Sequence, residues 1–184
     1  MVVIIVVGMP GSGKDVFLQC AKAMGFGHVG MGDTVRRYAA INGLDSSDAT
    51  IGGYAGSERQ AHGPAIWAQR TLERMPTGNT VIDGSRSLEE IAFFRKELGA
   101  DLRVIAITVP REIRFKRLQQ RHREDDPQKL DDLVRRDSRE MSWGLGKAIE
   151  SADIAIDNDR GLDEFRVKCK TVLENILIID GKSI

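Results

Sequence analysis

The feature that most constrains this chain is a glycine-rich segment placed between a strand and a helix. Residues 2–7 form an unbroken run of Val and Ile, which is typical of a strand buried on both faces of a parallel sheet. The segment 8–14, Gly-Met-Pro-Gly-Ser-Gly-Lys, follows at once, and a helical pattern begins at Lys14. This order matches the phosphate-binding P-loop, in which backbone N–H groups and a helix N-terminus surround a polyphosphate.

The loop itself supplies the first candidate site residues. We expect the nucleotide to contact the loop residues and the residue after them: Gly8, Met9, Pro10, Gly11, Ser12, Gly13, Lys14 and Asp15. Lys14 is also a candidate catalytic residue, because its ammonium group would bridge the β- and γ-phosphates of ATP. Asp15 stands where a P-loop usually carries Ser or Thr to bind Mg²⁺. A carboxylate can replace that ligand, but it equally suits the first turn of a helix, so both interpretations stay open.

A second candidate metal ligand ends a later apolar run. Residues 80–82 predict a strand, and Asp83 and Gly84 follow it directly. In P-loop proteins an acidic residue in this place holds Mg²⁺ or a water bound to it. The alternative is an ordinary Asp-Gly turn. Beside a P-loop the functional interpretation is favoured, and Asp83 joins Asp15 as a predicted Mg²⁺ ligand.

Strand and helix patterns alternate along the rest of the chain. Besides the first strand and the run at 80–82, strands are expected at 28–31, 102–109 and 153–156. Helical patterns occupy 14–24, 88–98, 112–121 and 163–173. The alternation predicts an α/β, three-layer P-loop NTPase fold around a five-stranded, mainly parallel sheet. The late run 176–179 fits either a further strand or the end of the last helix.

Two regions interrupt the alternation within a single expected domain, 1–184. Residues 32–76 show helical patterns without a strand, with a polar loop expected at 43–57, and are interpreted as an inserted acceptor-binding region. Residues 111–140 contain ten Lys or Arg and eight Asp or Glu, which indicates a solvated, mobile helical segment. We interpret this second region as a short lid.

Composition narrows the functional classes. The 27 Lys and Arg residues balance 27 Asp and Glu residues, and a net charge of zero argues against general nucleic-acid or membrane-surface binding. No apolar run approaches the length of about 18 residues that a membrane span needs. Cys20 and Cys169 show no metal-binding spacing, so reduced, packed thiols in a cytoplasmic protein are expected. The sequence leaves the oligomeric state open.

Three further segments resemble those of small nucleotide kinases. The segment 32–36, Gly-Asp-Thr-Val-Arg, resembles the Gly-Asp-x-x-Arg element that opens the monophosphate-binding helix of adenylate kinases. The segment 83–86, Asp-Gly-Ser-Arg, resembles their Asp-Gly-Phe-Pro-Arg element, shortened by one residue. Residues 152–158 resemble the late strand and Asn turn of dephospho-CoA kinases. Over nearly its full length the chain resembles the archaeal adenylate-kinase-like or dephospho-CoA-kinase-like small P-loop kinases, which have the nucleoside monophosphate kinase fold.

This resemblance implies an acceptor site and a lid. Arg36 and Arg86 would bind the acceptor, since their planar guanidinium groups suit a phosphate. Asp33 would bind there too, and would act as the catalytic base if the acceptor is a hydroxyl, as in dephospho-CoA. The alternative for Asp33 is a helix N-cap. Arg117 and Arg121 fall where such kinases have catalytic lid arginines.

The sequence thus predicts an ATP- and Mg²⁺-dependent kinase that transfers the γ-phosphoryl group to a small, nucleotide-like acceptor. A nucleoside monophosphate and dephospho-CoA are both compatible with the motifs, as are ATP and GTP as donors. The alternative is a nucleotide-binding regulatory protein with little transferase activity. Asp15 keeps this alternative open, because its negative charge would lie beside the phosphates.

Overall fold

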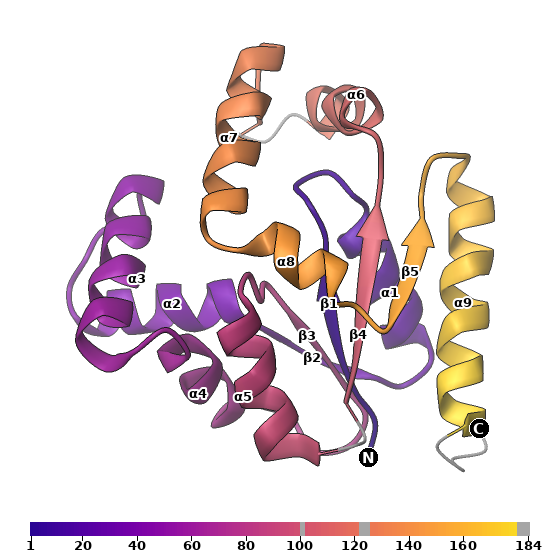
Figure 1. The fold of residues 1–184 in the computed structure, drawn as a ribbon, viewed down its shortest axis with the longest axis horizontal. Coiled ribbons are helices and arrows are strands. Elements are labelled where there is room, and N and C mark those ends of the chain that lie inside the picture. Colours follow the sequence, from indigo (N-terminus) through magenta and orange to yellow (C-terminus); the bar gives the residue numbers. More distant parts are fainter. Residues whose placement is uncertain (100–101, 122–125, 180–184) are drawn as a thin grey trace.

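The computed structural model describes residues 1–99, 102–121 and 126–179 (Figure 1). Within these residues, five strands form one sheet in the order β2-β3-β1-β4-β5. The strands are β1 (Val3–Val7), β2 (Gly27–Gly30), β3 (Thr80–Asp83), β4 (Leu102–Thr108) and β5 (Ile154–Asp157). Every neighbouring pair is parallel. The expected α/β fold with a five-stranded sheet is confirmed.

Helices follow or connect the strands. They are α1 (Lys14–Ala23), α2 (Met31–Ile41), α3 (Asp48–His62), α4 (Ile66–Leu72), α5 (Leu88–Leu98), α6 (Arg111–Arg121), α7 (Leu130–Ser142), α8 (Leu145–Glu150) and α9 (Leu162–Ile179). The predicted acceptor-binding region contains α2, α3 and α4, and the predicted lid contains α6 and most of α7. Residues 122–125 of that lid lie outside the described residues. No helix in the described part of the chain has the length and apolar character needed to cross a membrane.

The central strand β1 explains why helices cover both faces of the sheet. Ile4 belongs to an apolar cluster that includes Phe17 of α1. The next residue, Ile5, belongs to the opposite cluster, with Trp67 of α4 and Phe94 of α5. All residues of β1 are buried, and successive side chains of a strand point to opposite faces. Each such Val or Ile stabilises the fold by roughly 1.5–3 kcal/mol, so an entirely apolar strand holds three layers together.

Helix α3 corrects one expectation from the sequence. A polar loop was expected at 43–57, but the helix begins at Asp48. The hydroxyl of Ser47 caps it, accepting a hydrogen bond from the backbone N–H of Thr50 at 3.4 Å. Glycine has a low helix propensity, and the three glycines between 52 and 56 hide the helical pattern. The indole N–H of Trp67 supplies a tertiary contact that the sequence does not reveal, donating to the Ala55 carbonyl at 3.1 Å.

The last helix decides the alternative left open for residues 176–179. These residues form the final turn of α9 and not a further strand. Ile176 and Leu177 are buried in the core, whereas Ile178 and Ile179 are exposed. A one-sided pattern of this kind is typical of an amphipathic helix end.

The two cysteines lie together between α1 and α9, although they are distant in the sequence. Both are free and buried, and their thiols are hydrogen-bonded to each other. Burial, with a contribution from Cys20, raises the pKa of the Cys169 thiol to about 12. A thiol with so high a pKa is a poor nucleophile, which agrees with a packing role.

The register of the sheet gathers the ends of the strands that carry the predicted site. Val6 of β1 is paired with Asp83 of β3, and Asp83 is paired with Gly30 of β2. The P-loop, the 83–86 segment and α2 therefore leave the sheet side by side. Helices α6 and α7 lie above this carboxyl edge, at the top of Figure 1. In open parallel sheets, ligands bind outside the carboxyl ends of the strands.

Candidate active site

The phosphate loop is held in shape by glycine and by an asparagine behind it. Gly11 and Gly13 have φ values of 78° and 102°, which L side chains rarely adopt. A Cβ atom on Gly13 would lie 2.4 Å from Nδ2 of Asn158, the residue after β5. That amide group donates a hydrogen bond to the Ser12 carbonyl at 2.8 Å. Glycine is therefore required at position 13 by both backbone conformation and space.

Lys14 lies against the opening of this loop. Its ammonium group donates hydrogen bonds to the carbonyls of Gly8 at 2.7 Å and Met9 at 3.5 Å. Burial lowers the pKa of Lys14, while the nearby carboxylates of Asp83 and Glu140 oppose the shift. A buried ammonium among carbonyls and carboxylates is ready to neutralise an incoming phosphate.

The acidic residues beside Lys14 fit a magnesium ion. Burial raises the pKa of Asp83, with a smaller effect in the same direction from Asp15, while Lys14 lowers it. Within the described residues, Oδ1 of Asp83 and the Ser12 hydroxyl are buried without a hydrogen-bond partner. Mg²⁺ prefers oxygen ligands and takes most of them from water and phosphate, so one or two carboxylates suffice. No group of three or more metal-binding side chains occurs among the described residues.

The predicted acceptor residues of α2 lie on its exposed side. Arg36 Nη1 contacts Asp33 Oδ1 at 3.2 Å, and the two side chains are 60% and 65% exposed. Both are therefore open to a ligand. Gly30 is the N-cap of α2 and Asp33 its third residue, so the N-cap interpretation of Asp33 is wrong.

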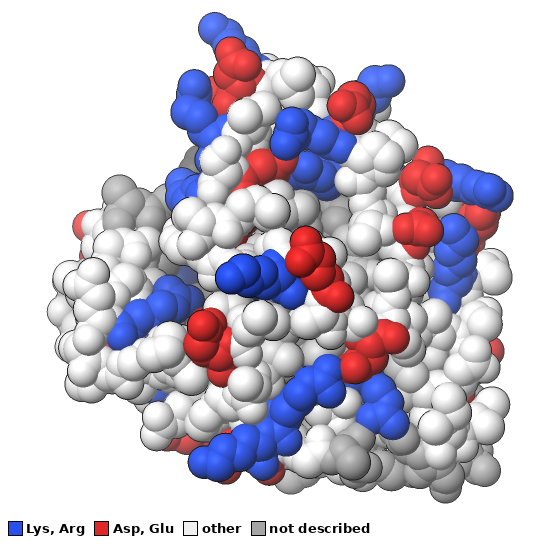
Figure 2. Space-filling view, in the orientation of Figure 1, with Lys and Arg blue, Asp and Glu red and all other residues white. Residues whose placement is uncertain are grey.

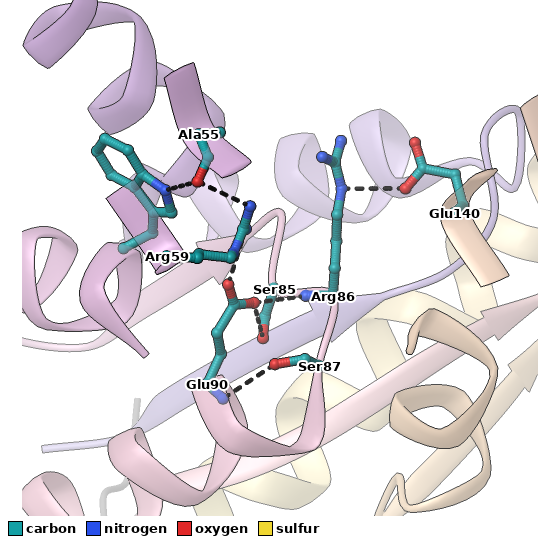
Figure 3. Close-up of polar contacts among 8 residues, drawn as sticks. Ala55, Arg59, Ser85, Arg86, Ser87, Glu90 and Glu140 are labelled. Atoms are coloured by element: carbon teal, nitrogen blue, oxygen red, sulfur yellow. Dashed lines mark hydrogen bonds and ion pairs between the residues drawn. The ribbon is translucent and has the colours of Figure 1, made fainter. Parts of the chain in front are cut away.

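Arg86 is clamped by residues of α7 and the turn after it. Its Nε atom contacts Glu140 Oε2 at 3.0 Å, and its guanidinium carbon lies 4.6 Å from the ring centre of Trp143. In Figure 3 the Nε edge faces Glu140 and the Nη atoms extend beyond it. Sequence reasoning missed Glu140, since nothing in a charge-rich segment singles out the residues that reach Arg86.

The arginines of α6 have different surroundings. Arg117 donates to the carbonyl of Asn158 at 2.9 Å and to its side-chain oxygen at 3.2 Å. Arg121 forms an ion pair with Asp126 at 2.5 Å. The two predicted lid arginines are thus held by different partners, one in the turn after β5 and the other at Asp126.

Arg114 corrects the expectation that this whole segment is solvated. It is buried and forms a bidentate ion pair with Asp137 of α7, at 2.9 and 2.6 Å. It also donates a hydrogen bond to the carbonyl of Pro10 at 3.1 Å. This side chain therefore joins α6, α7 and the phosphate loop.

One cleft of about 740 Å³ brings nearly all of the predicted residues together. The predicted residues that line it are Gly8, Pro10, Gly11, Ser12, Gly13, Lys14, Asp15, Asp33, Arg36, Asp83, Arg86, Arg117 and Arg121. Met9 does not line it, because its side chain packs against the core cluster of β1 and α4. The sequence missed Arg59 and Arg139, which line the cleft as well.

The cleft concentrates positive charge in a chain that has none overall. Eight Lys or Arg residues line it, against four Asp or Glu residues. On the outer face seen in Figure 2, basic and acidic side chains are interspersed. A cleft with an excess of one sign of charge attracts ligands of the opposite sign, so the ligand expected here is an anion.

Comparison with known proteins gives the family of this chain. The AAA domain family matches residues 7–134. A UPF0200 protein from Thermoplasma acidophilum is 42% identical over 180 residues, which cover 97% of this chain and 99% of that protein. The chain belongs to the UPF0200 family, and it carries the AAA domain.

Solved kinase structures share the fold of this UPF0200 protein. Shikimate kinase from Bacteroides thetaiotaomicron matches with a TM-score of 0.65 and 14% identity, covering 96% of this chain and 98% of that chain. Dephospho-CoA kinase from Campylobacter jejuni matches with a TM-score of 0.56 and 19% identity, covering 98% of both chains. At such identities the likeness establishes the fold alone. The resemblance to small P-loop kinases is confirmed at that level.

Proposed function

We propose that this UPF0200 protein is an ATP-dependent phosphotransferase that acts on a small, nucleotide-like acceptor. The observation that carries the proposal is the cleft, because the phosphate loop with Lys14 lines the same space as Arg36, an exposed arginine of α2. Phosphoryl transfer needs little covalent help from a protein. It needs two substrates held in line and cations around the moving charge, and the lining residues can supply both.

On the donor side, the loop amides and Lys14 bind the polyphosphate of ATP. Asp83 and Asp15 hold Mg²⁺, which when bound neutralises charge on the phosphate oxygens. The buried, unpartnered Oδ1 of Asp83 supports this assignment among the described residues. Arg117 and Arg121, on the α6 side of the cleft, add positive charge and help to exclude water, the competing acceptor.

On the acceptor side, Arg36 and Arg86 bind an anionic group of a nucleoside monophosphate or of dephospho-CoA. A phosphate acceptor is already nucleophilic and needs no base. A hydroxyl acceptor must lose its proton, and Asp33 is then the group that receives it. The exposure of Asp33 and its place on the cleft wall support this role.

The test is a thermal-unfolding panel with ATP, GTP, AMP and dephospho-CoA, each with and without Mg²⁺. A ligand that binds only the native state stabilises it by about 2.7 kcal/mol at roughly a hundred times its Kd. We expect Mg·ATP to stabilise the native protein and the Lys22→Ala control, whose lysine is an exposed residue of α1. Lys14→Ala should lose the effect. Equal stabilisation of all three proteins, or none of any, would overturn the proposal.

A second candidate function is a nucleotide-binding regulator with little transfer activity. Asp15 favours it, because it lines the cleft and its charge acts on both Lys14 and Asp83. Asp15→Ser restores the usual loop residue and separates the two candidates. A regulator predicts that the native protein binds Mg·ATP without turnover while Asp15→Ser transfers phosphate. A kinase predicts turnover by the native protein.

The proposal also covers the partners of the protein and its cellular compartment. Zero net charge, and basic and acidic side chains interspersed on the face drawn in Figure 2, support a small-molecule partner rather than general binding to nucleic acid or membranes. We place the protein in the cytoplasm, where ATP and both candidate acceptors are available.

A further inference from the structure

A fully buried carboxylate joins two walls of the acceptor side of the cleft. Oε1 of Glu90, in the first turn of α5, accepts a hydrogen bond from Arg59 Nη2 at 3.1 Å (Figure 3). Oε2 accepts one from the backbone N–H of Arg86 at 2.8 Å and one from the Ser85 hydroxyl at 3.4 Å. Arg59 belongs to α3, whereas Ser85 and Arg86 follow β3. Glu90 therefore links the helical wall to the loop that carries Arg86.

These contacts hold Arg59 in place but leave some of its N–H donors available. Its Nη1 atom donates to the carbonyl of Ala55 at 3.5 Å, and the same carbonyl accepts from the buried indole of Trp67. The Arg59 side chain is 29% exposed and lines the cleft. Only one hydrogen on each Nη atom is used by these bonds, so further N–H donors remain for a ligand.

Burying the Glu90 carboxylate costs free energy, which suggests a role beyond stabilising the fold. A carboxylate taken out of water needs full compensation, and a buried ion pair is often no better for stability than apolar residues of similar size. Here the compensation comes from Arg59, from two groups of the Arg86 loop and from the N-terminal end of α5. The arrangement ties the guanidinium group of Arg59 to the backbone of Arg86.

We propose that Arg59 is a further ligand of the acceptor's anionic group, and that Glu90 is a positioning residue that holds Arg59 and the Arg86 loop for it. This rests on the proposed function. The anion is then approached from three elements: by Arg36 from α2, by Arg59 from α3 and by Arg86 from the loop after β3. Guanidinium groups on several sides suit a tetrahedral phosphate better than a planar carboxylate. The acceptor's anionic group is therefore a phosphate, either the monoester of a nucleoside monophosphate or the diphosphate of dephospho-CoA.

The experiment measures binding of AMP, dephospho-CoA and inorganic phosphate by calorimetry, with a non-hydrolysable Mg·ATP analogue present. Arg59→Gln should weaken binding of at least one probe roughly ten- to a hundredfold, the range expected for a lost charged hydrogen bond. Arg59→Lys should lie between the native protein and Arg59→Gln, because it keeps the charge without the fork. Affinity for the ATP analogue should stay within about twofold in both.

The matched control is another ion pair of α3. Glu58 and Arg70 of α4 are 2.6 Å apart and both are partly buried, but neither lines the cleft. Arg70→Gln should lower the unfolding temperature without changing the affinity for any probe. Equal weakening by Arg70→Gln and Arg59→Gln would mean that Arg59 acts only through the fold, and would contradict the proposal.

A double-variant cycle tests Glu90 separately from its contribution to folding. Glu90→Gln should weaken probe binding in the native background and have a smaller effect in the Arg59→Gln background, because Glu90 acts in part through Arg59. A purely structural role predicts a lower unfolding temperature with equal effects in both backgrounds. If Glu90→Gln does not fold, the Arg59 variants decide the question, since the Arg59 side chain is partly exposed and can be changed without opening the core.

The outcomes separate this inference from the proposed function. Transfer to an acceptor with a normal KM in Arg59→Gln would contradict the inference and leave the kinase function intact. Probe binding that depends on Arg59, without transfer to any acceptor, would support the inference and contradict the kinase function. Failure of the native protein to bind all three probes would contradict both.

Discussion

Burial acts against both charges next to the phosphate loop. It lowers the pKa of Lys14 and raises the pKa of Asp83, while the attraction between the two groups opposes both shifts. Groups with pKa values perturbed in this way are concentrated at functional sites. A ligand that stabilises their charged forms is bound tightly. A polyphosphate with its metal ion carries both charges that are needed: the phosphate is opposite in charge to Lys14, and the metal ion is opposite in charge to Asp83.

Asp83→Asn should abolish the Mg²⁺ dependence of ATP binding. In the native protein, that dependence should weaken as the pH falls toward the pKa of Asp83, because a protonated carboxyl group cannot bind the metal. Since this pKa is raised, the loss should begin at milder acidity than for an ordinary aspartate. Calorimetric titration of ATP with and without Mg²⁺ at several pH values checks this. The exposed Asp163→Asn is the control, and unchanged Mg²⁺ dependence in Asp83→Asn would contradict the assignment.

At the scale of elements, α6 and α7 are fixed to the loop more firmly than a detached lid would be. Arg114 and Asp137 form their bidentate pair with only 5% and 4% of their side chains exposed. Arg111 adds a contact to Asp137 at 3.1 Å. The part of α6 that holds Arg114 therefore anchors this helix to α7 and the phosphate loop, while Arg117 and Arg121 further along the helix line the cleft.

Asp137→Asn should lower the free energy of unfolding by about 3–5 kcal/mol, because it leaves the buried guanidinium of Arg114 without a charged partner. Chemical denaturation measures the change. Asp163→Asn removes an exposed ion pair with Arg166 and should cost at most about 1 kcal/mol. A cost for Asp137→Asn as small as that of the control would show that the pair does not hold α6 and α7 in place.

Helix α3 presents glycines where it lines the cleft. A Cβ atom on Gly52, Gly53 or Gly56 would meet nothing within 4 Å, so packing does not require glycine there. Gly53→Ala should raise the free energy of unfolding by about 0.5–1 kcal/mol through helix propensity, yet weaken AMP binding if the acceptor lies against α3. Denaturation and calorimetry on one sample decide. A more stable variant with native AMP affinity would show that the acceptor does not lie against this helix.

These elements also mark how far the sequence predicts the structure. Strand β1 and the segment 8–14 were predictable because their chemistry is local: a run of β-branched residues, then glycines and a lysine in a fixed order. Helix α3 was not, since its glycines oppose the local signal and a contact from Trp67 supports it. Arg36 and Arg86 were found through motifs that resemble those of known kinases.

At the scale of the whole molecule, the register of the sheet brings the parts of the site together. Strands far apart in the sequence end at one edge, so the phosphate loop, the acid after β3 and the start of α2 converge without any local signal. For the same reason Glu90 and Glu140 were not predictable: each acts through a partner that only the folded chain brings near. The zero net charge of the chain likewise gives no sign of a cleft whose charged lining residues are mainly basic.

The most direct test of the account is phosphorus NMR of the native protein mixed with Mg·ATP and, in turn, AMP and dephospho-CoA. We predict loss of the γ-phosphate signal with growth of a phosphorylated-acceptor signal, retained in Lys22→Ala and lost in Lys14→Ala. ATP left intact, or γ-phosphate released to water at the same rate with and without an acceptor, would contradict the claim that this cleft transfers phosphate between two bound substrates.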